Sequence, residues 1–161
     1  MENLKLFKLK EEYAVYLHGV DHRVQLNKNS RRPYVGVVLS VNGFNYFVPM
    51  ESPKPNHKNI KNSVHIMRLK NGEYGLLGFN NMLPARPANL ICFNIADISD
   101  KQYRELLRNQ IDFCNRHKQK IHEQAEKTYE IVTKKTSKFH LSICCDFIKL
   151  EHACIDYKQP E

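Results

Sequence analysis

The sequence has no apolar run long enough to cross a bilayer. Its longest apolar stretches, such as Tyr34–Val41, have the length of a strand, whereas a membrane-spanning helix needs about 20 apolar residues. The first residues interleave lysines with leucines and lack the continuous apolar segment of a signal peptide. We therefore expect a cytoplasmic protein that neither spans a membrane nor is exported.

Motifs for metals and nucleotide cofactors are missing as well. The five cysteines are an odd number, and no two of them have the Cys-x2-Cys spacing of a zinc site. Cys144, His152 and Cys154, and likewise Cys114 with His117, fit buried thiols and solvated side chains better than metal ligands. There is no Gly-x-Gly-x-x-Gly and no phosphate-loop lysine motif. We expect reduced cysteines, no metal and no cofactor.

Acidic side chains are scarce, since 17 Asp and Glu face 25 Lys and Arg and leave a net charge of +8. The surplus is concentrated in residues 28–70, where Glu51 is the single acid. The basic side chains of this segment are Lys28, Arg31, Arg32, Lys54, Lys58, Lys61, Arg68 and Lys70. They cannot be neutralised by local ion pairs, so we expect them to bind an external polyanion such as nucleic acid.

A second basic stretch, at residues 101–140, has a different pattern. Its charges of both signs recur at helical spacing, as with Arg108 and Asp112, which is typical of a solvated helix face. Arg116, Lys118 and Lys120 form a denser group within it. We keep these three side chains as a candidate second wall of a nucleic-acid groove.

Two Asn-Gly pairs mark tight turns in the first half of the chain. Tyr34–Met50 contains two β-branched or aromatic runs separated by Asn42-Gly43, a pair that readily supplies the positive φ angles of a type I′ turn. This pattern predicts a β-hairpin, and Asn71-Gly72 predicts another tight turn. Further strands are expected at Leu4–Leu9, Val64–Leu69, Glu73–Phe79 and Ala88–Ile95.

Helical periodicity dominates the second half. Ser99 is the expected N-cap of a long helix, or of a broken pair of helices, over residues 100–134. Shorter helices are expected at Glu11–Val20 and at residues 142–156. Together these elements predict an α+β fold in a single domain, residues 1–161: a compact, strongly curved antiparallel sheet with packed helices, the longest in the C-terminal half.

The loop after the hairpin gathers reactive groups. Residues 51–57, Glu-Ser-Pro-Lys-Pro-Asn-His, hold a carboxylate, a hydroxyl, an ammonium and an imidazole, and two prolines restrict their backbone. Cleavage of RNA without a metal needs the 2′-hydroxyl as nucleophile, a proton acceptor, positive charge on the transition state and a proton donor for the 5′-oxygen. Lys54 can supply charge or the proton, and Ser52 and Arg32 can hold phosphate oxygens. On local composition, a solvated surface turn explains the loop equally well.

The hairpin and this loop carry a family resemblance. Tyr34-Val-Gly-Val-Val-Leu, Asn42-Gly43 and Tyr46-Phe-Val-Pro-Met-Glu-Ser-Pro-Lys54 resemble the signature of the ToxN/AbiQ family of type III toxin–antitoxin endoribonucleases, and of its CptN-like branch in particular. Weaker similarity extends through Tyr74–Pro84 and into the helices after Ser99. The resemblance therefore covers most of the chain.

The resemblance implies a Kid/MazF-like barrel and metal-independent cleavage of A-rich RNA to 2′,3′-cyclic phosphate and 5′-hydroxyl ends. It implies that the toxin processes, and is inhibited by, its own small RNA pseudoknot antitoxin. Cellular or phage RNA would be the substrate. Protein and antitoxin would form a closed ring, a heterohexamer of three copies of each.

The resemblance also implies roles for particular side chains. The catalytic serine and lysine of the family fall on Ser52 and Lys54, whereas Glu51 stands where the family has Thr or Ser. Glu51 can orient Lys54, act as a base or repel phosphate, and the basic residue of the preceding loop corresponds to Arg32 or Lys28. We predict that the catalytic residues are Ser52, Lys54, Glu51 and Arg32. The predicted RNA-binding residues are Lys28, Arg31, His57, Lys58, Lys61, Arg116, Lys118 and Lys120.

The alternative function is a non-catalytic RNA-binding module, in which the basic loops only clamp phosphates. The aromatic side chains of the hairpin do not favour it, because their alternation with smaller apolar residues is typical of a core rather than of a base-stacking platform. A DNA-binding protein ranks third, since no helix-turn-helix is apparent.

Overall fold

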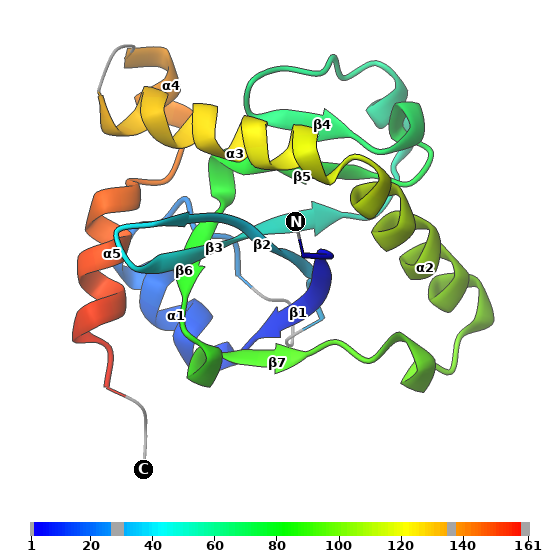
Figure 1. Cartoon of the computed structure of the whole chain (residues 1–161), viewed down its shortest axis with the longest axis horizontal. Helices are drawn as coiled ribbons and strands as arrows, with labels where there is room; N and C mark the ends of the chain where they lie inside the picture. The colour runs from blue at the N-terminus through cyan, green and yellow to red at the C-terminus, as the bar shows by residue number, and fades with distance from the viewer. Residues whose placement is uncertain (1, 27–30, 135–137, 159–161) are drawn as a thin grey trace.

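A seven-stranded antiparallel sheet forms the centre of the molecule, and helices pack against it (Figure 1). The structure is a computed structural model and describes residues 2–26, 31–134 and 138–158. The strands are β1 (Lys5–Leu9), β2 (Tyr34–Val41), β3 (Phe44–Glu51), β4 (Ile66–Arg68), β5 (Leu76–Gly78), β6 (Leu83–Ala85) and β7 (Leu90–Cys92). The helices are α1 (Glu11–Val20), α2 (Lys101–Arg116), α3 (Lys118–Thr133), α4 (Lys138–Ile143) and α5 (Phe147–Asp156). The predicted α+β class is confirmed.

The hairpin predicted around Asn42-Gly43 is formed by β2 and β3. Asn42 has φ of 53° and Gly43 has φ of 80°, the left-handed backbone that a type I′ turn requires. The strands pair antiparallel, with Tyr34 opposite Pro49. Most of their side chains are buried, so the alternation of aromatic and β-branched residues has become the core of the sheet.

Strand β3 has three partners. It pairs with β2 along one edge, while its other edge pairs first with β6, through Asn45–Phe47, and then with β5, through Met50 and Glu51. The strand order is β4-β5-β3-β2-β1-β7, and no pairing joins β4 to β7 within the described residues. The predicted barrel is therefore not confirmed: the sheet twists strongly but is not closed, and each of its edge strands has only three residues (Figure 1).

The later strands are shorter than predicted, and β6 was not predicted at all. Residues 64–69, 73–79 and 88–95 each yield only a three-residue strand, because tight 3-10 turns take up the flanking positions. β6 contains Pro84, which lacks a backbone N–H and argues against a strand in the sequence. The position is tolerated beside β3, where Pro84 lies opposite Tyr46.

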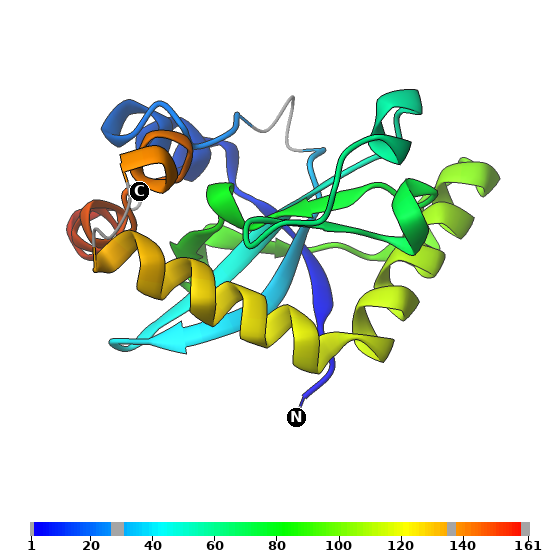
Figure 2. The ribbon, with the colours of Figure 1, turned by 90° about the horizontal axis from the view of Figure 1, so that it is seen from above.

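The two longest helices are α2 and α3, as predicted for the C-terminal half. The expected break falls at His117, whose φ of −116° and ψ of 22° end one helix and begin the next. Figure 2 shows the two helices meeting at a sharp corner. The predicted cap at Ser99 is wrong by one residue, because the carboxylate of Asp100 accepts from the backbone N–H of Tyr103 at 3.1 Å.

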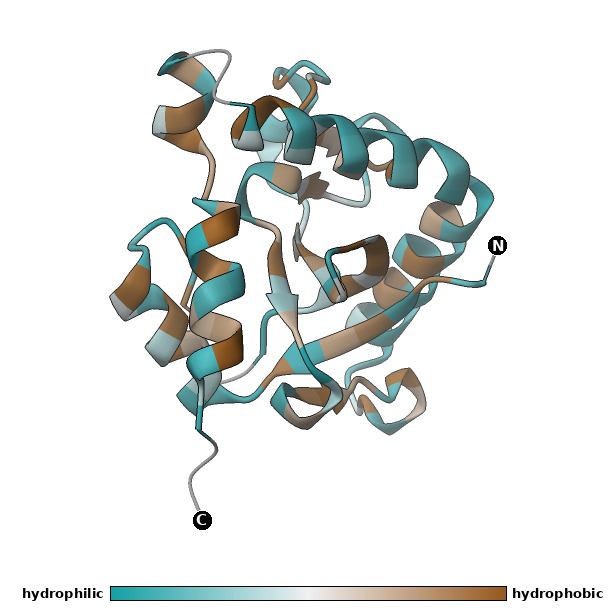
Figure 3. Ribbon diagram, turned by 60° about the vertical axis from the view of Figure 1, so that its left-hand side comes forward, coloured by the Kyte–Doolittle hydropathy of each residue, from teal (hydrophilic) through white to brown (hydrophobic). Residues whose placement is uncertain are grey.

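The last predicted helix, residues 142–156, corresponds to α5 and starts at Phe147, five residues later than predicted. Residues 144–146 separate α4 from α5, and the Asp146 carboxylate accepts from the Lys149 backbone N–H to cap α5. Figure 3 shows hydrophobic and hydrophilic segments alternating along α5, as expected for a helix with one buried face. α5 packs on β6, α1 and α3, and α3 packs on β2. Among the described residues, no helix is long and apolar enough to cross a membrane.

A buried carboxylate joins the hairpin to two helices. Glu151 of α5 is 5% exposed, and its Oε2 accepts from the hydroxyls of Tyr46 at 2.5 Å and Tyr129 at 2.8 Å. Its Oε1 accepts from the amide of Asn42 at 3.4 Å. Each hydrogen bond to a charged group contributes about 1.5–3 kcal/mol. Glu151 therefore fixes the turn of the hairpin, α3 and α5 relative to one another.

Replacing Glu151 tests this junction. Glu151→Ala leaves two buried tyrosine hydroxyls without an acceptor, so the free energy of unfolding should fall by about 3 kcal/mol. Glu151→Gln keeps one acceptor oxygen and should lose less than half as much. Urea unfolding followed by circular dichroism measures both values. A Glu151→Ala variant within 0.5 kcal/mol of the parent would contradict the role given to this carboxylate.

Candidate active site

The predicted reactive loop starts where β3 ends. A cavity of about 240 Å³ opens there, between the loop, the chain entering β2 and the first turn of α2. Its lining residues are Arg31, Arg32, Pro33, Met50, Glu51, Ser52, Lys54 and Tyr103. The structure therefore brings all four predicted catalytic residues to one cavity, together with Arg31 from the predicted RNA-binding set. Ser52 and Lys54 are both exposed there.

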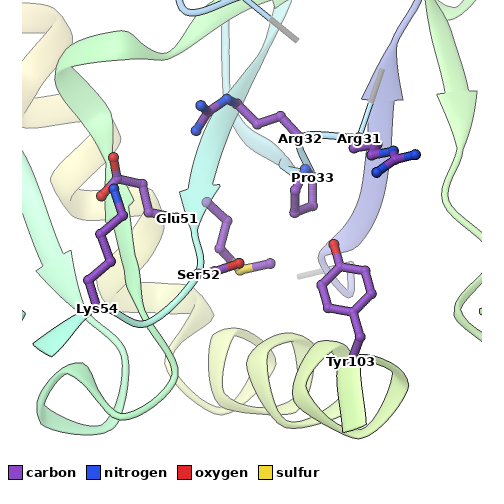
Figure 4. A pocket seen from close by; sticks show the side chains of 8 residues that line it. Arg31, Arg32, Pro33, Glu51, Ser52, Lys54 and Tyr103 are labelled. Atoms are coloured by element: carbon purple, nitrogen blue, oxygen red, sulfur yellow. The ribbon is translucent and has the colours of Figure 1, made fainter. Parts of the chain in front are cut away.

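Figure 4 shows how these side chains are divided around the strand end. Glu51 and Lys54 extend on one side of β3, whereas Arg31 and Tyr103 lie on the other. Three cations and one carboxylate therefore surround the cavity. A site with this excess of positive charge attracts a phosphate group.

Arg32 is half-buried, unlike its exposed neighbour Arg31. Its Nε is buried and has no hydrogen-bond partner in the described part of the chain. The backbone here is held in place, because the Met50 N–H donates to the Pro33 carbonyl at 3.0 Å. A half-buried guanidinium with an Nε–H donor that has no partner among the described residues is suited to bind a phosphate oxygen.

His57 lies on the inner side of the loop and is hydrogen-bonded to Lys54. Its backbone N–H donates to the Lys54 carbonyl at 3.0 Å, and its ring Nδ1 accepts from the Lys54 N–H at 3.2 Å. With Nδ1 as acceptor, the neutral ring carries its proton on Nε2, and Nε2 lies 3.4 Å from Oε2 of Glu51. His57 therefore links the Glu51 carboxylate to the Lys54 backbone.

The burial of His57 corrects the role predicted for it. The side chain is 1% exposed and faces the protein interior, so it does not present its ring to RNA. The sequence pattern places an imidazole near the reactive groups but does not say on which side of a 3-10 turn it lies. In the structure His57 is a positioning residue for Glu51 and the loop.

The turn between β4 and β5 packs against the backbone of the loop. Gly75 has φ of +94°, and a Cβ atom at this position would lie 1.8 Å from the carbonyl oxygen of Glu51. Gly72, with φ of +93°, packs in the same way against the backbone of His57, where a Cβ would lie 3.0 Å from the carbonyl oxygen. The close contact with Glu51 needs a residue without a side chain. The predicted Asn71-Gly72 turn thus supports the site.

Tyr103 was missed by the sequence reasoning. It lies in the first turn of α2, and its hydroxyl points toward the cavity (Figure 4). Burial raises the pKa of this hydroxyl, so it stays a protonated hydrogen-bond donor at neutral pH. An aromatic residue after a helix cap is a common pattern, and only the tertiary structure shows that this turn reaches the Ser52 loop.

The other predicted RNA-binding residues lie away from the cavity. Lys58 and Lys61 are exposed further along the loop. Arg116, Lys118 and Lys120 occupy the corner between α2 and α3, about 20 Å along α2 from Tyr103 at 1.5 Å per residue. They do not form a wall of this cavity. Lys28 lies outside the described residues.

Four of the five cysteines are packing residues. Cys114, Cys144, Cys145 and Cys154 are buried, while Cys92 is exposed. Burial raises the pKa of Cys114 to about 12 and that of Cys144 to about 11, which keeps both as unreactive thiols at neutral pH. In the described residues, no three His, Cys, Asp or Glu side chains gather as metal ligands would.

A family model described as "Toxin ToxN, type III toxin-antitoxin system" matches residues 5–155. The chain belongs to this toxin family. Endoribonuclease ToxN of Bacillus thuringiensis subsp. kurstaki is 36% identical over 98% of this chain and 86% of that protein. Endoribonuclease AbiQ of Lactococcus lactis subsp. lactis is 29% identical, over 92% and 86% respectively. The chain is thus an endoribonuclease.

Solved structures agree with this relationship. One, from work on type III systems with "selective toxin inhibition by a non-coding RNA pseudoknot", has a TM-score of 0.86 and 33% identity, covering 99% of this chain and 100% of that chain. Another, of AbiQ, "a lactococcal anti-phage endoribonuclease", has a TM-score of 0.86 and 28% identity, covering 96% and 97%. The matches include ToxN and AbiQ alike, so the CptN-like branch stays a prediction.

Gly75→Ala tests the support of the loop, with Gly43→Ala as the matched control. Both glycines are left-handed, so both variants should lose about 1–2 kcal/mol of stability from backbone strain. A Cβ added at Gly43 would meet no neighbouring atom within 4 Å, whereas the new methyl group at Gly75 must displace the Glu51 carbonyl.

Because Ser52 follows Glu51 directly, Gly75→Ala should also slow RNA cleavage by about 100-fold, as expected for a misplaced reactive group. The rate is measured at a temperature at which both variants are folded by circular dichroism. Equal cleavage rates for the two variants would show that the contact between Gly75 and Glu51 does not position the loop.

Proposed function

We propose that this toxin cleaves RNA without a metal ion, by attack of a ribose 2′-hydroxyl on the adjacent phosphorus. The observation that supports it is the single cavity shared by the Ser52 hydroxyl, the Lys54 ammonium and the Arg32 guanidinium. A phosphate there meets hydrogen-bond donors and positive charge from several directions. These are the groups that stabilise a dianionic, phosphorane-like transition state.

The proposed reaction is one displacement at phosphorus. A bond forms between the 2′-oxygen and phosphorus, and the bond between phosphorus and the 5′-oxygen breaks. The products carry a 2′,3′-cyclic phosphate and a 5′-hydroxyl. The Glu51 carboxylate, oriented by His57, takes the proton of the 2′-hydroxyl, and the Lys54 ammonium supplies the proton of the 5′-oxygen. Ser52 and Arg32 hold the non-bridging phosphate oxygens.

The proposal extends to substrates and partners. A-rich cellular or phage RNA is the proposed substrate, and a small RNA pseudoknot is the proposed antitoxin that the toxin processes and is inhibited by. Support comes from the relative whose toxin is inhibited by a non-coding RNA pseudoknot and from AbiQ, described as anti-phage. The toxin is proposed to be a single domain that acts in the cytoplasm. Three toxins and three RNAs are proposed to form a closed ring.

A single 2′-deoxynucleotide at the mapped cut site should abolish cleavage, because the nucleophile is removed while every phosphate contact remains. Ser52→Ala should slow cleavage of the all-ribose RNA by about 100- to 1000-fold, as for the loss of one oxyanion donor. Both are measured by denaturing gel electrophoresis in the presence of EDTA, with product ends identified by mass spectrometry. Cleavage of the deoxy-substituted RNA at the same position would exclude this mechanism.

Lys54→Met and Lys61→Met separate catalysis from binding. Both lysines are exposed on the same basic loop, but only Lys54 lines the cavity. Each loss of a phosphate contact should weaken RNA binding slightly and reduce its salt dependence. Lys54→Met should in addition slow the single-turnover rate by about 100-fold or more, since charge and a proton donor are lost in the transition state.

The measurements are single-turnover rates at saturating enzyme and affinities from fluorescence anisotropy over a range of salt. If both variants cleaved at the parent rate and differed only in affinity, Lys54 would be a phosphate clamp, as in a non-catalytic RNA-binding module.

A further inference from the structure

A second cavity lies on the opposite face of the strand that carries the active site. Side chains alternate along β3, so Met50 lines the first cavity while its neighbour Pro49 lines the second. The second cavity has a volume of about 170 Å³. Glu51 lines both and is their shared wall. A group bound in the second cavity therefore lies next to the reacting phosphate.

Among the described residues, the lining of the second cavity contains no Lys or Arg side chain. Glu51 is the one charged side chain that the structure describes in this lining, and it would repel a phosphate. Its polar groups are instead the carboxamides of Gln25, Asn80 and Asn81. Its apolar surface comes from Pro49, Ile60, Ile66 and Leu76. Apolar walls with a few amide groups are suited to an aromatic heterocycle rather than to the RNA backbone.

One of the three carboxamides has a structural function. Asn80 donates from Nδ2 to the Ile143 carbonyl at 3.3 Å, and its own backbone carbonyl accepts from the Cys145 N–H at 2.8 Å. Gln25 differs, because its Oε1 is buried and has no hydrogen-bond partner within the described residues. A buried amide oxygen without a partner destabilises the protein. A bound N–H group would remove this destabilisation.

We propose that this cavity binds an unpaired nucleobase of the RNA next to the cleaved phosphate and reads its exocyclic amino group. Gln25 Oε1 and the Glu51 carboxylate accept from the amino group, and the Gln25 or Asn81 amide N–H donates to the ring nitrogen beside it. Adenine and cytosine present this edge. Uracil lacks the amino group, and guanine has an N–H donor where the ring acceptor is needed.

This inference rests on the proposed cleavage reaction and adds its sequence selectivity. Unstacked bases of RNA are commonly read by hydrogen bonds to their edges within an apolar pocket. Because Glu51 belongs to both cavities, a base seated correctly in one would also place its phosphate correctly in the other. Selectivity would then appear in the cleavage rate and not only in affinity.

The test removes the amino group alone. A short RNA with a single cut site carries adenine, cytosine, guanine or uracil in turn at the positions flanking the cut. The preferred base is then replaced by its analogue without an amino group, purine riboside for adenine or pyrimidin-2-one riboside for cytosine. Single-turnover cleavage by the parent enzyme should fall by about 10- to 100-fold, the usual effect of one unpaired polar group in a recognition site.

Gln25→Met keeps the length of the side chain and removes the amide. It should slow cleavage of the amino-bearing RNA and reduce the difference between that RNA and the analogue, because only the Glu51 carboxylate then accepts from the amino group. Asn81→Ala provides an independent variant and should reduce the same difference. Gln119→Met is the matched control on the exposed surface of α3 and should behave as the parent does.

The outcomes separate this inference from the proposed reaction. In one outcome, cleavage by the parent depends on the 2′-hydroxyl, but Gln25→Met and Asn81→Ala distinguish the amino-bearing RNA from the analogue as well as the parent does. If both variants are folded by circular dichroism, this result refutes the base-binding cavity and leaves the proposed reaction intact. The same conclusion follows if uracil is preferred at both flanking positions. If cleavage does not depend on the 2′-hydroxyl, the proposed reaction itself fails.

Discussion

The candidate site depends on one constraint: strand β3 pairs up to its last residue, and the loop that follows it is exposed. Its last residues pair with β5, and the chain reaches β5 through a turn that contains Gly75. The carbonyl of Glu51 is in such close contact with Gly75 that a side chain would not fit there. The backbone is therefore fixed up to the residue before Ser52, and exposure begins at Ser52 itself.

The unbalanced charge of residues 28–70 is divided by the fold into parts with different functions. Arg31, Arg32 and Lys54 converge on the cavity with one carboxylate among them, whereas Lys58 and Lys61 stay exposed beyond it. Repulsion among converging cations costs folding free energy, and a bound polyanion offsets that cost. The convergence of these cations therefore points to an anion-binding site, which a uniformly basic surface would not do.

Short sequence patterns predicted the features that depend on neighbouring residues alone. Asn42-Gly43 identified the hairpin, and the composition of residues 51–57 together with the family resemblance predicted the reactive loop. The inward orientation of His57, the approach of Tyr103 from α2 and the carboxamide of Gln25 beside β3 depend on contacts between segments distant in sequence, and no periodicity encodes them. The open sheet was missed for the same reason, since closure depends on whether the two edge strands meet.

Glu51 shows why an acid can persist in the most basic part of the chain. A lone carboxylate would weaken phosphate binding, but here the buried His57 donates toward it and holds it at the border between two cavities of opposite character. On one side it faces cations and the proposed phosphate site, and on the other it faces amides and apolar walls. A carboxylate in this place can accept a proton from a hydroxyl or an amino hydrogen from a base, and neither requires it to contact phosphate.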